Sequence, residues 1–197
     1  PLAAESAAEM LEIADTAMNT TERTMTPLLD FMLVPSRRTG ESRSIRPQPA
    51  EGEKSYRFQW NSPIVISAHN SKTIYYAGNF FFKSSNRGDS WTKISPDLTN
   101  GVDRYTLPIM GKPVDRTTLS RNDGVQNWPA TTTIAESSFS PNILWAGTDD
   151  GNLWVTRDGA QNWKNVYDKL PGLPKGLYVS RVIASRGSAG TSVQPGN

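Results

Sequence analysis

The sequence predicts an all-β fold made of repeated antiparallel meanders, preceded by an N-terminal α-helix. A short motif that ends in tryptophan occurs twice, and each copy closes a series of short strand-like segments separated by turn residues. The composition agrees with this, because six tryptophans, 14 prolines and 15 glycines among 197 residues are typical of a turn-rich β protein. A repeated unit of this kind predicts a repeat architecture, so each element is justified from the repeat outward.

The repeated motif places a hydroxyl residue two positions before Asn or Asp, then glycine, then tryptophan. We call each copy of this motif a box. The first box lies in NFFFKSSNRGDSWTKIS and the second in GNLWVTRDGAQNWKNV. Their members are Ser84, Asn86, Gly88, Ser90 and Trp91, and Thr156, Asp158, Gly159, Asn162 and Trp163. The polar side chains can hydrogen-bond backbone N–H groups that a hairpin leaves unpaired, and glycine supplies a positive φ. Tryptophan then fills the space between neighbouring sheets, so the boxes are predicted to be structural.

Each box ends a set of four predicted strands joined by hairpin turns. The first set is expected at residues 63–68, 73–77, 80–84 and 91–95, and the second at residues 131–136, 143–146, 152–156 and 163–167. Two such meanders predict successive blades of a β-propeller. A further first strand begins at Tyr178 in YVSRVIASR. The expected fold is therefore a partial β-propeller, with two four-stranded blades and the first strand of a third.

The boxes resemble the Asp-box or BNR repeat, Ser/Thr-x-Asp-x-Gly-x-Thr-Trp, of sialidases, xyloglucan-cleaving glycoside hydrolases, photosystem assembly factors and sortilin receptors. Asn86 stands for the aspartate and Ser90 for the threonine in the first box, and Ala160 occupies the glycine position in the second. WNSPIVISAHN, SRNDGVQNW and GTDDGNLWVTRDG also resemble the sortilin-like and xyloglucanase-like propeller repeats of large bacterial exported proteins. The resemblance covers residues from about 56 to 186 and implies a propeller that binds or cleaves a ligand.

Composition divides the chain into four regions. Residues 1–34 form the N-terminal helical segment, 35–55 a linker, 56–186 the propeller blades and 187–197 a disordered tail. The helix is expected at residues 1–20, where apolar residues recur at helical spacing. The linker is rich in Arg, Ser, Pro and Glu, and its arginines offer an anion-binding patch as the alternative to a solvated linker. These arginines are Arg37, Arg38, Arg43 and Arg46.

Charge and residue usage exclude several classes of function. A net charge of +2, with basic and acidic residues interspersed, argues against a nucleic-acid partner. No segment approaches the roughly 20 apolar residues that a membrane span requires. The sequence has no cysteine, so thiol catalysis, disulfides and cysteine-bound zinc are excluded, and neither a metal nor a cofactor is expected. The resemblance implies an extracellular or periplasmic location, although the first residues lack a signal-peptide pattern.

The resemblance to propeller repeats also implies how the loops are sorted by face. The loops between second and third strands share one face with the loops between blades, and ligands bind most often there. The residues expected on this ligand face are Asn79, Asp97, Asp103, Arg104, Asp115 and Arg116, together with Asp149 and Asp150. The boxes are expected on the opposite side.

Catalytic chemistry has few candidates in this sequence. Asp149 and Asp150 are candidates for the paired carboxylates that glycoside hydrolysis requires, and GTDDG is also an ordinary turn composition. The arginines that a sialidase triad would need are Arg104, Arg116 and Arg181, but they lie in no matching motif. The only histidine, His69, is expected to cap a turn. LSRNDGVQNWP, residues 119–129, resembles a box with altered spacing and is expected to be a loop whose Trp128 packs against the fold.

Two functions remain from this reasoning. The first is a binding or scaffold propeller for a protein, peptide or glycan, and the alternative is a glycoside hydrolase of the xyloglucanase type acting on β-glucans. A propeller needs at least about four blades, and open blade edges promote association. We therefore expect self-association, or blades from further chain, to complete the ring. Because a binding propeller needs only surface loops, we prefer the first function.

Overall fold

A computed structural model describes residues 33–35, 40–109, 111–115, 117–118, 127–185 and 191–195. The chain divides into two compact units, Pro1–Arg46 and Pro47–Asn197. In the first unit, β1 (Leu33–Pro35) and β2 (Ser42–Ser44) form an antiparallel hairpin. The helix predicted at residues 1–20 lies outside the described residues, as do Arg37 and Arg38 of the predicted anion patch.

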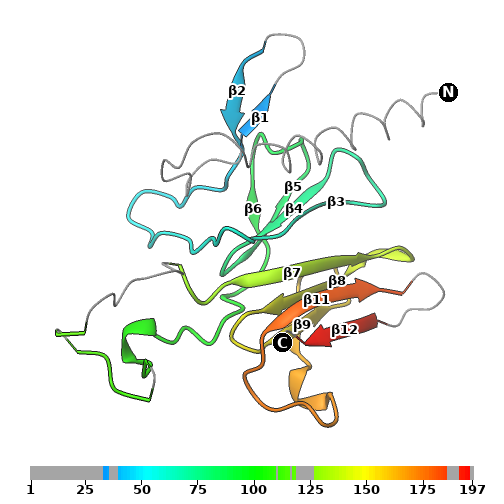
Figure 1. Ribbon diagram of the computed structural model, residues 1–197. Helices are drawn as coiled ribbons and strands as arrows, with labels where there is room; N and C mark the ends of the chain where they lie inside the picture. The colour runs from blue at the N-terminus through cyan, green and yellow to red at the C-terminus, as the bar shows by residue number, and fades with distance from the viewer. Residues whose placement is uncertain are drawn as a thin grey trace. The chain divides into compact units, whose positions relative to one another are not determined.

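The second unit contains three antiparallel sheets that follow one another along the chain (Figure 1). The first sheet is β3 (Ile64–Ile66), β4 (Ile74–Ala77), β5 (Phe81–Ser84) and β6 (Thr92–Lys93). The second is β7 (Thr131–Ser137), β8 (Ser140–Thr148), β9 (Leu153–Thr156) and β10 (Lys164–Asn165). The third is β11 (Val179–Ala184) and β12 (Thr191–Pro195). Each sheet keeps sequence order, so the predicted all-β partial propeller is confirmed.

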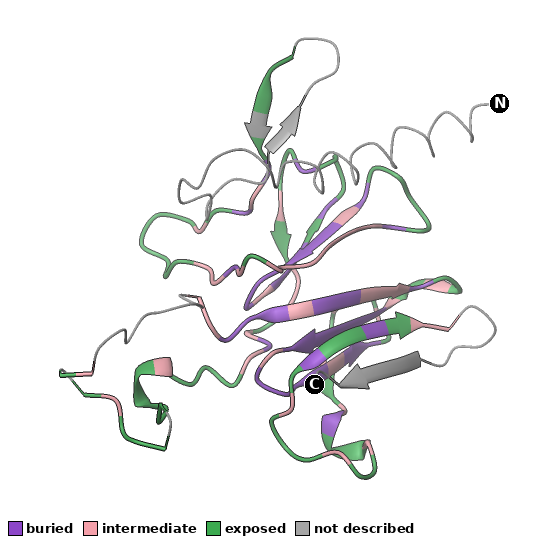
Figure 2. Cartoon of the chain, in the orientation of Figure 1, coloured by how far each residue is buried: buried purple, intermediate pink, exposed green. Residues whose placement is uncertain are grey.

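Apolar side chains fill the spaces between successive sheets. One buried cluster joins the first two sheets and contains Tyr75, Ala77, Phe81, Leu98, Ile134, Leu144 and Ala146. A second cluster joins the second and third sheets and contains Trp145, Leu153, Val155, Tyr167, Val179 and Val182. In Figure 2 the buried residues lie mainly along β4, β5, β7, β8 and β9, whereas β6 is exposed. Face-to-face packing of small twisted sheets is the packing of propeller blades.

Tryptophans connect the first two blades. The indole of Trp163 lies 5.3 Å from the Phe81 ring, measured between centroids, and its Nε1 donates to the Ile94 carbonyl at 2.8 Å. Trp154 donates in the same way to the Leu98 carbonyl at 2.7 Å. The second box tryptophan therefore contacts the first sheet from the second. In the first box, the Trp91 ring lies 6.1 Å from that of Tyr76, within its own blade.

The boxes close their hairpins as their chemistry predicts. In the first box the Ser84 hydroxyl accepts from the Gly88 N–H at 2.8 Å, and Asn86 Oδ1 accepts from the Ser90 N–H at 3.0 Å. In the second box Thr156 accepts from the Ala160 N–H at 3.0 Å, and Asp158 Oδ1 from the Asn162 N–H at 2.9 Å. The positive φ falls on two consecutive residues in each turn, and these are Arg87 and Gly88, and Gly159 and Ala160.

The same bonds set the charge state of the second box. Asn162 donates to Asp158 from its backbone and from its side chain, and these hydrogen bonds lower the pKa of Asp158 to about 2. Its carboxylate is therefore held ionised by the turn that it closes.

Two predicted regions differ from the structure. Residues 187–197 were expected to be a disordered tail, but β12 within this stretch pairs along β11, because a blade edge offers unpaired backbone groups that a following segment can satisfy. The predicted linker 35–55 contains β2, and the second compact unit already begins at Pro47. Tyr56 and Phe58 pack against Phe82 with ring centroids 4.9 and 5.8 Å away, and the Tyr56 hydroxyl donates to Glu53 at 2.8 Å. Aromatic packing thus attaches the end of this polar stretch to the first blade.

Candidate functional site

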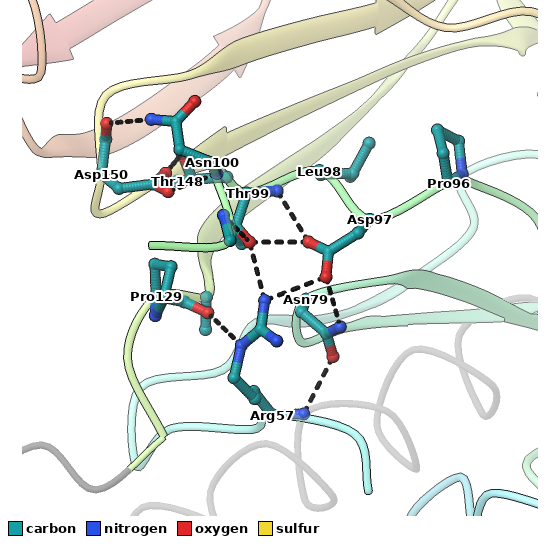
Figure 3. A network of polar contacts seen from close by, with 12 residues as sticks. Arg57, Asn79, Pro96, Asp97, Leu98, Thr99, Asn100, Pro129, Thr148 and Asp150 are labelled. Carbon is teal, nitrogen blue, oxygen red and sulfur yellow. Dashed lines mark hydrogen bonds and ion pairs between the residues drawn. The ribbon is translucent and has the colours of Figure 1, made fainter. Parts of the chain in front are cut away.

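The structure brings several predicted ligand-face residues into one polar network where the first two blades meet (Figure 3). Asn79 lies in the β4–β5 turn, Asp97 follows β6, and Asp149 and Asp150 form the β8–β9 turn. These turns come together because successive blades stack with the same strand order, as the propeller prediction requires. We call this set of contacts the seam.

Arg57 is the centre of the seam. Its Nη2 donates to Asp97 at 2.9 Å and to the Thr99 hydroxyl at 2.7 Å, and its Nε donates to the Pro129 carbonyl at 3.0 Å. Its backbone N–H donates to Asn79 Oδ1 at 2.8 Å. The guanidinium thus ties the segment before β3 to the chain that follows β6 and to the chain that enters β7.

Asp97 is saturated by this network. Asn79 Nδ2 donates to Oδ2 at 2.9 Å, and Thr99 donates to Oδ1 from its hydroxyl at 2.6 Å and from its backbone at 3.0 Å. Burial acts to raise the pKa of Asp97, but the hydrogen bonds from Thr99 and Asn79 and the charge of Arg57 outweigh it, so this pKa lies below its ordinary value. Asp97 is a fixed anion that holds the seam together.

Asp150 is also committed to structure. Its side chain is buried, with Oδ1 accepting from the Thr148 hydroxyl at 2.5 Å and from Asn152 Nδ2 at 2.9 Å. Its Oδ2 accepts from the Asn100 N–H at 2.6 Å, which ties the turn to the loop after β6. A carboxylate with this set of partners has no free oxygen to act as a base or nucleophile.

Asp149 differs from its neighbour. Its Oδ1 accepts from the Ala130 N–H at 2.9 Å, and its Oδ2 accepts from Gln59 Nε2. Burial raises the pKa of Asp149 to about 6, and the charge of Asp150 adds to the rise, although hydrogen bonds from Ala130 and Gln59 oppose it. A carboxyl group with a pKa near 6 is suited to general acid chemistry. Both oxygens of each of the other two seam carboxylates already accept hydrogen bonds, so the seam offers Asp149 no free partner for a two-carboxylate mechanism.

A hollow of about 220 Å³ lies beside the seam. Its lining combines charged and aromatic side chains with loop backbone, from Arg57, Gly101, Val102, Asp103, Arg104, Tyr105, Trp128 and Pro129. The 3₁₀ turn η2 (Arg104–Thr106) shapes one wall, because Asp103 Oδ1 accepts from the Tyr105 N–H at 2.9 Å and fixes the start of the turn. Asp103 and Arg104 were expected on this face, whereas Trp128, expected to pack against the fold, contributes to the hollow.

The remaining ligand-face predictions lie elsewhere. Asp115 caps its own turn in the long loop between β6 and β7, where hydrogen bonds from Thr117 and then Thr118 hold its pKa below the ordinary value. Arg116 and residues 119–126 of the box-like loop lie outside the described residues. Sequence reasoning missed Arg57 and Gln59, although an arginine between Tyr56 and Phe58, beside a predicted strand, was a signal for a half-buried ion pair.

A second polar cluster joins the first two blades through the β3–β4 turn. Glu136 accepts from the hydroxyls of Ser67 at 2.9 Å and Tyr75 at 3.0 Å, and His69 Nε2 donates to the Ser137 carbonyl at 2.8 Å. Sialidases use a tyrosine nucleophile, but Tyr75 is only 2% exposed. Burial and the Glu136 charge raise the pKa of Tyr75, which is the opposite of nucleophile activation. This cluster is therefore a blade contact.

Within the described ranges, no group of three or more His, Asp or Glu side chains could hold a metal ion. The part of the chain that the structure describes also contains no helix long and apolar enough to cross a membrane.

Comparisons with known proteins show similarity to xyloglucanases. The chain is 27% identical over 165 residues to a probable oligoxyloglucan-reducing end-specific xyloglucanase of Neosartorya fischeri, which covers 84% of this chain and 16% of that protein. It is 28% identical over 128 residues to the oligoxyloglucan-reducing end-specific xyloglucanase of Emericella nidulans, which covers 65% of this chain and 14% of that protein. The chain therefore spans about one-sixth of the length of the relatives that it matches. No family model matches the sequence.

A solved structure shares the fold. The extracellular domain of a protein from B. thetaiotaomicron, described as a one-component system, superposes with a TM-score of 0.50 at 9% identity, over 85% of this chain and 18% of that one. At this identity the likeness concerns the fold alone.

Proposed function

We propose that this chain contributes consecutive Asp-box blades to a β-propeller that binds glycan outside the cytoplasm, as a recognition or scaffold module. The observation that carries the proposal is the similarity to two xyloglucanases over up to 84% of the chain. The location outside the cytoplasm is part of this proposal; the protein that shares the fold is itself described as an extracellular domain, and we extend that location to this chain.

The hollow beside the seam supports a glycan ligand. Pyranose rings present apolar C–H faces that stack on aromatic side chains, and their hydroxyls pair with planar donors and carboxylates. Tyr105, 41% exposed, and Trp128 supply aromatic surface, while Arg57, Arg104 and Asp103 supply polar groups. This mixture is suited to a neutral polar ligand better than to a purely apolar one.

The alternative is a glycoside hydrolase of the xyloglucanase type, and Asp149 is the residue that favours it. Its raised pKa is suited to a general acid, but hydrolysis needs a second carboxyl group about 5 to 10 Å away. Asp97 and Asp150 are committed to the seam. Binding therefore explains the geometry of these residues with fewer requirements than catalysis does.

The proposal is tested with the 197-residue chain by isothermal titration calorimetry against soluble xyloglucan and mixed-linkage β-glucan. We expect saturable binding that Tyr105→Ala weakens about tenfold. The matched control is Leu107→Ala, because Leu107 has similar exposure in the same loop and does not line the hollow. Binding equal in the two variants would place the ligand elsewhere, and absence of binding to both polymers would overturn a glycan function.

Hydrolysis is measured in parallel as the release of reducing ends from the same polymers. Turnover that Asp149→Asn abolishes would favour the hydrolase. Binding without turnover would favour the recognition module.

The number of blades also leads us to a proposal about assembly. The described sheets amount to fewer blades than the roughly four that a closed propeller requires. We infer that further blades, from more of the same polypeptide or from a second copy, complete the ring. Light scattering after size exclusion tests this for the chain itself, since a compact monomer would exclude self-association as the route.

A further inference from the structure

Trp60 is the most exposed large apolar side chain in the described residues, at 82%. It lies at the tip of a turn from Gln59 to Ser62. The Ser62 N–H donates to the Gln59 carbonyl at 3.1 Å, and the Gln59 N–H donates to the Ser62 hydroxyl at 2.8 Å. These reciprocal bonds fix the turn, so Trp60 projects from a rigid support.

The neighbouring blades hold this turn on both sides. Gln59 donates to Asp149 of the second blade, and Asn61 Nδ2 donates to the hydroxyl of Tyr178, directly before the third sheet, at 3.0 Å. Asn127, before the second sheet, donates to the Phe58 carbonyl at 3.0 Å. Segments from three sheets therefore converge around an exposed tryptophan, and ordering so many groups about an unburied ring suggests a surface prepared for a ligand.

An aromatic residue lies shortly before the first strand of each of the three sheets. Trp60 precedes β3, Trp128 precedes β7 and Tyr178 precedes β11, and these first strands lie next to one another from sheet to sheet. Trp128 lines the hollow and Tyr178 is 37% exposed. The contacts at Phe58, Gln59 and Asn61 bring the starts of the three strands to one face. We call Trp60, Trp128 and Tyr178 the aromatic track.

We propose that the aromatic track binds an internal stretch of a linear polysaccharide that runs across the blades, with Trp60 as its principal stacking platform. This inference rests on the proposed glycan-binding function and adds where the chain lies and which form of ligand it takes. A polymer is favoured because the three aromatic residues precede the first strands of separate sheets and so offer more than one stacking surface to a chain of sugar rings. A protein partner is disfavoured because the groups around Trp60 are amides, a phenol and a carboxylate, and they form no contiguous apolar patch.

The test compares cellobiose, cellohexaose and soluble xyloglucan by titration calorimetry against the 197-residue chain. A track predicts that affinity rises from cellobiose to cellohexaose, because the longer chain reaches more than one ring. We expect Trp60→Ala to weaken cellohexaose and xyloglucan binding about tenfold, and Trp60→Phe to weaken it less, since it keeps a smaller ring. The Tm of both variants should match that of the wild type, because an 82% exposed side chain contributes little packing.

The matched control is Phe139→Ala, which removes an aromatic residue, 56% exposed, from the β7–β8 hairpin at the other end of β7. Binding unchanged in this variant, with a loss in Trp60→Ala, supports the track. Wild-type binding that Trp60→Ala leaves unchanged, or that does not increase with chain length, overturns the track while the glycan function stands. No wild-type binding to any of the three probes overturns the glycan function itself, and the track with it.

Discussion

Replacing Asp149 with asparagine should stabilise the protein at neutral pH. Burial raises the pKa of this carboxyl from its ordinary value of 3.8 to about 6. Each pKa unit corresponds to about 1.4 kcal/mol, so the full shift would be worth about 3 kcal/mol. The side chain is partly exposed and solvent screens its charge, and we therefore expect about 1 to 2 kcal/mol.

The direction follows from proton linkage. Between pH 3.8 and about 6 the folded protein binds a proton at Asp149 that the unfolded chain has released. The contribution of Asp149 to stability therefore falls as pH rises through this window. Asparagine does not titrate, so the difference in unfolding free energy between variant and wild type should be near zero at pH 3.5 and reach its full value above pH 7.

The seam can accept asparagine without losing a hydrogen bond. Its Oδ1 would keep the Ala130 N–H, and its Nδ2 would donate to Gln59 once the Gln59 amide turns over. Asp150→Asn is the matched control, because it makes the same change one residue away in a carboxylate that accepts three hydrogen bonds. We expect that control to lose about 2 kcal/mol at pH 7.5.

Urea unfolding from pH 3.5 to 8 measures these differences. At pH 7.5 the Asp149→Asn Tm should also rise by roughly 2 to 8 °C, given a shift of about 2 to 4 °C per kcal/mol for a chain of this size. A variant less stable than wild type at pH 7.5, or a free-energy difference that does not change between pH 4 and 6, would refute the assignment of a buried, proton-binding Asp149.

Three further changes test how the blades are held, each by urea unfolding at pH 7.5. Thr156→Val keeps the shape of a buried side chain but leaves the N–H of Ala160 without its acceptor. We expect the free energy of unfolding to fall by about 1 to 2 kcal/mol. The exposed Thr92→Val is the control and should not change it. In Gly147→Ala the new methyl would lie 2.5 Å from Val179 of the third sheet. We expect the free energy of unfolding to fall by about 1 to 3 kcal/mol. The exposed Ser138→Ala is the control and should not change it. Trp163→Phe removes the indole bond between the first two blades and should cost about 1 to 2 kcal/mol, while an unchanged midpoint would show that this tryptophan does not couple them.

The blades could be predicted from sequence because their signals are local. Alternating apolar residues and turn residues mark the strands, and each box forms its hydrogen bonds within a few residues. The structure places all eight predicted blade strands in order, and it shortens those that begin at the box tryptophans to Thr92–Lys93 and Lys164–Asn165. β12 could not be predicted in the same way, since TSVQP has little apolar content and gains strand geometry only by pairing with β11.

The meeting of these turns was predictable from the sequence, but the state of each carboxylate was not. Strand order alone places Asn79, Asp97, Asp149 and Asp150 on neighbouring turns. Whether each carboxylate is free or saturated depends on partners that lie far away along the chain, such as Arg57 for Asp97 and Gln59 for Asp149. Adjacent aspartates in GTDDG look equivalent in sequence, yet burial and hydrogen bonding give them different roles.

On this face the carboxylates and the exposed aromatic residues have different roles, which argues for binding over hydrolysis. Two of the three seam carboxylates hold the blades together. By contrast, Trp60 is 82% exposed and Tyr105 is 41% exposed. Changes in the seam should therefore alter stability more than ligand affinity, and changes in the exposed aromatic residues should do the reverse. Asp150→Asn should lower the unfolding midpoint while the folded variant keeps wild-type affinity. Trp60→Ala should keep the midpoint and lose affinity. Both results together would show that the two sets of residues act independently. A hydrolase centred on the seam predicts instead that changing these carboxylates abolishes the release of reducing ends, so that assay, run on the same variants, separates the two functions.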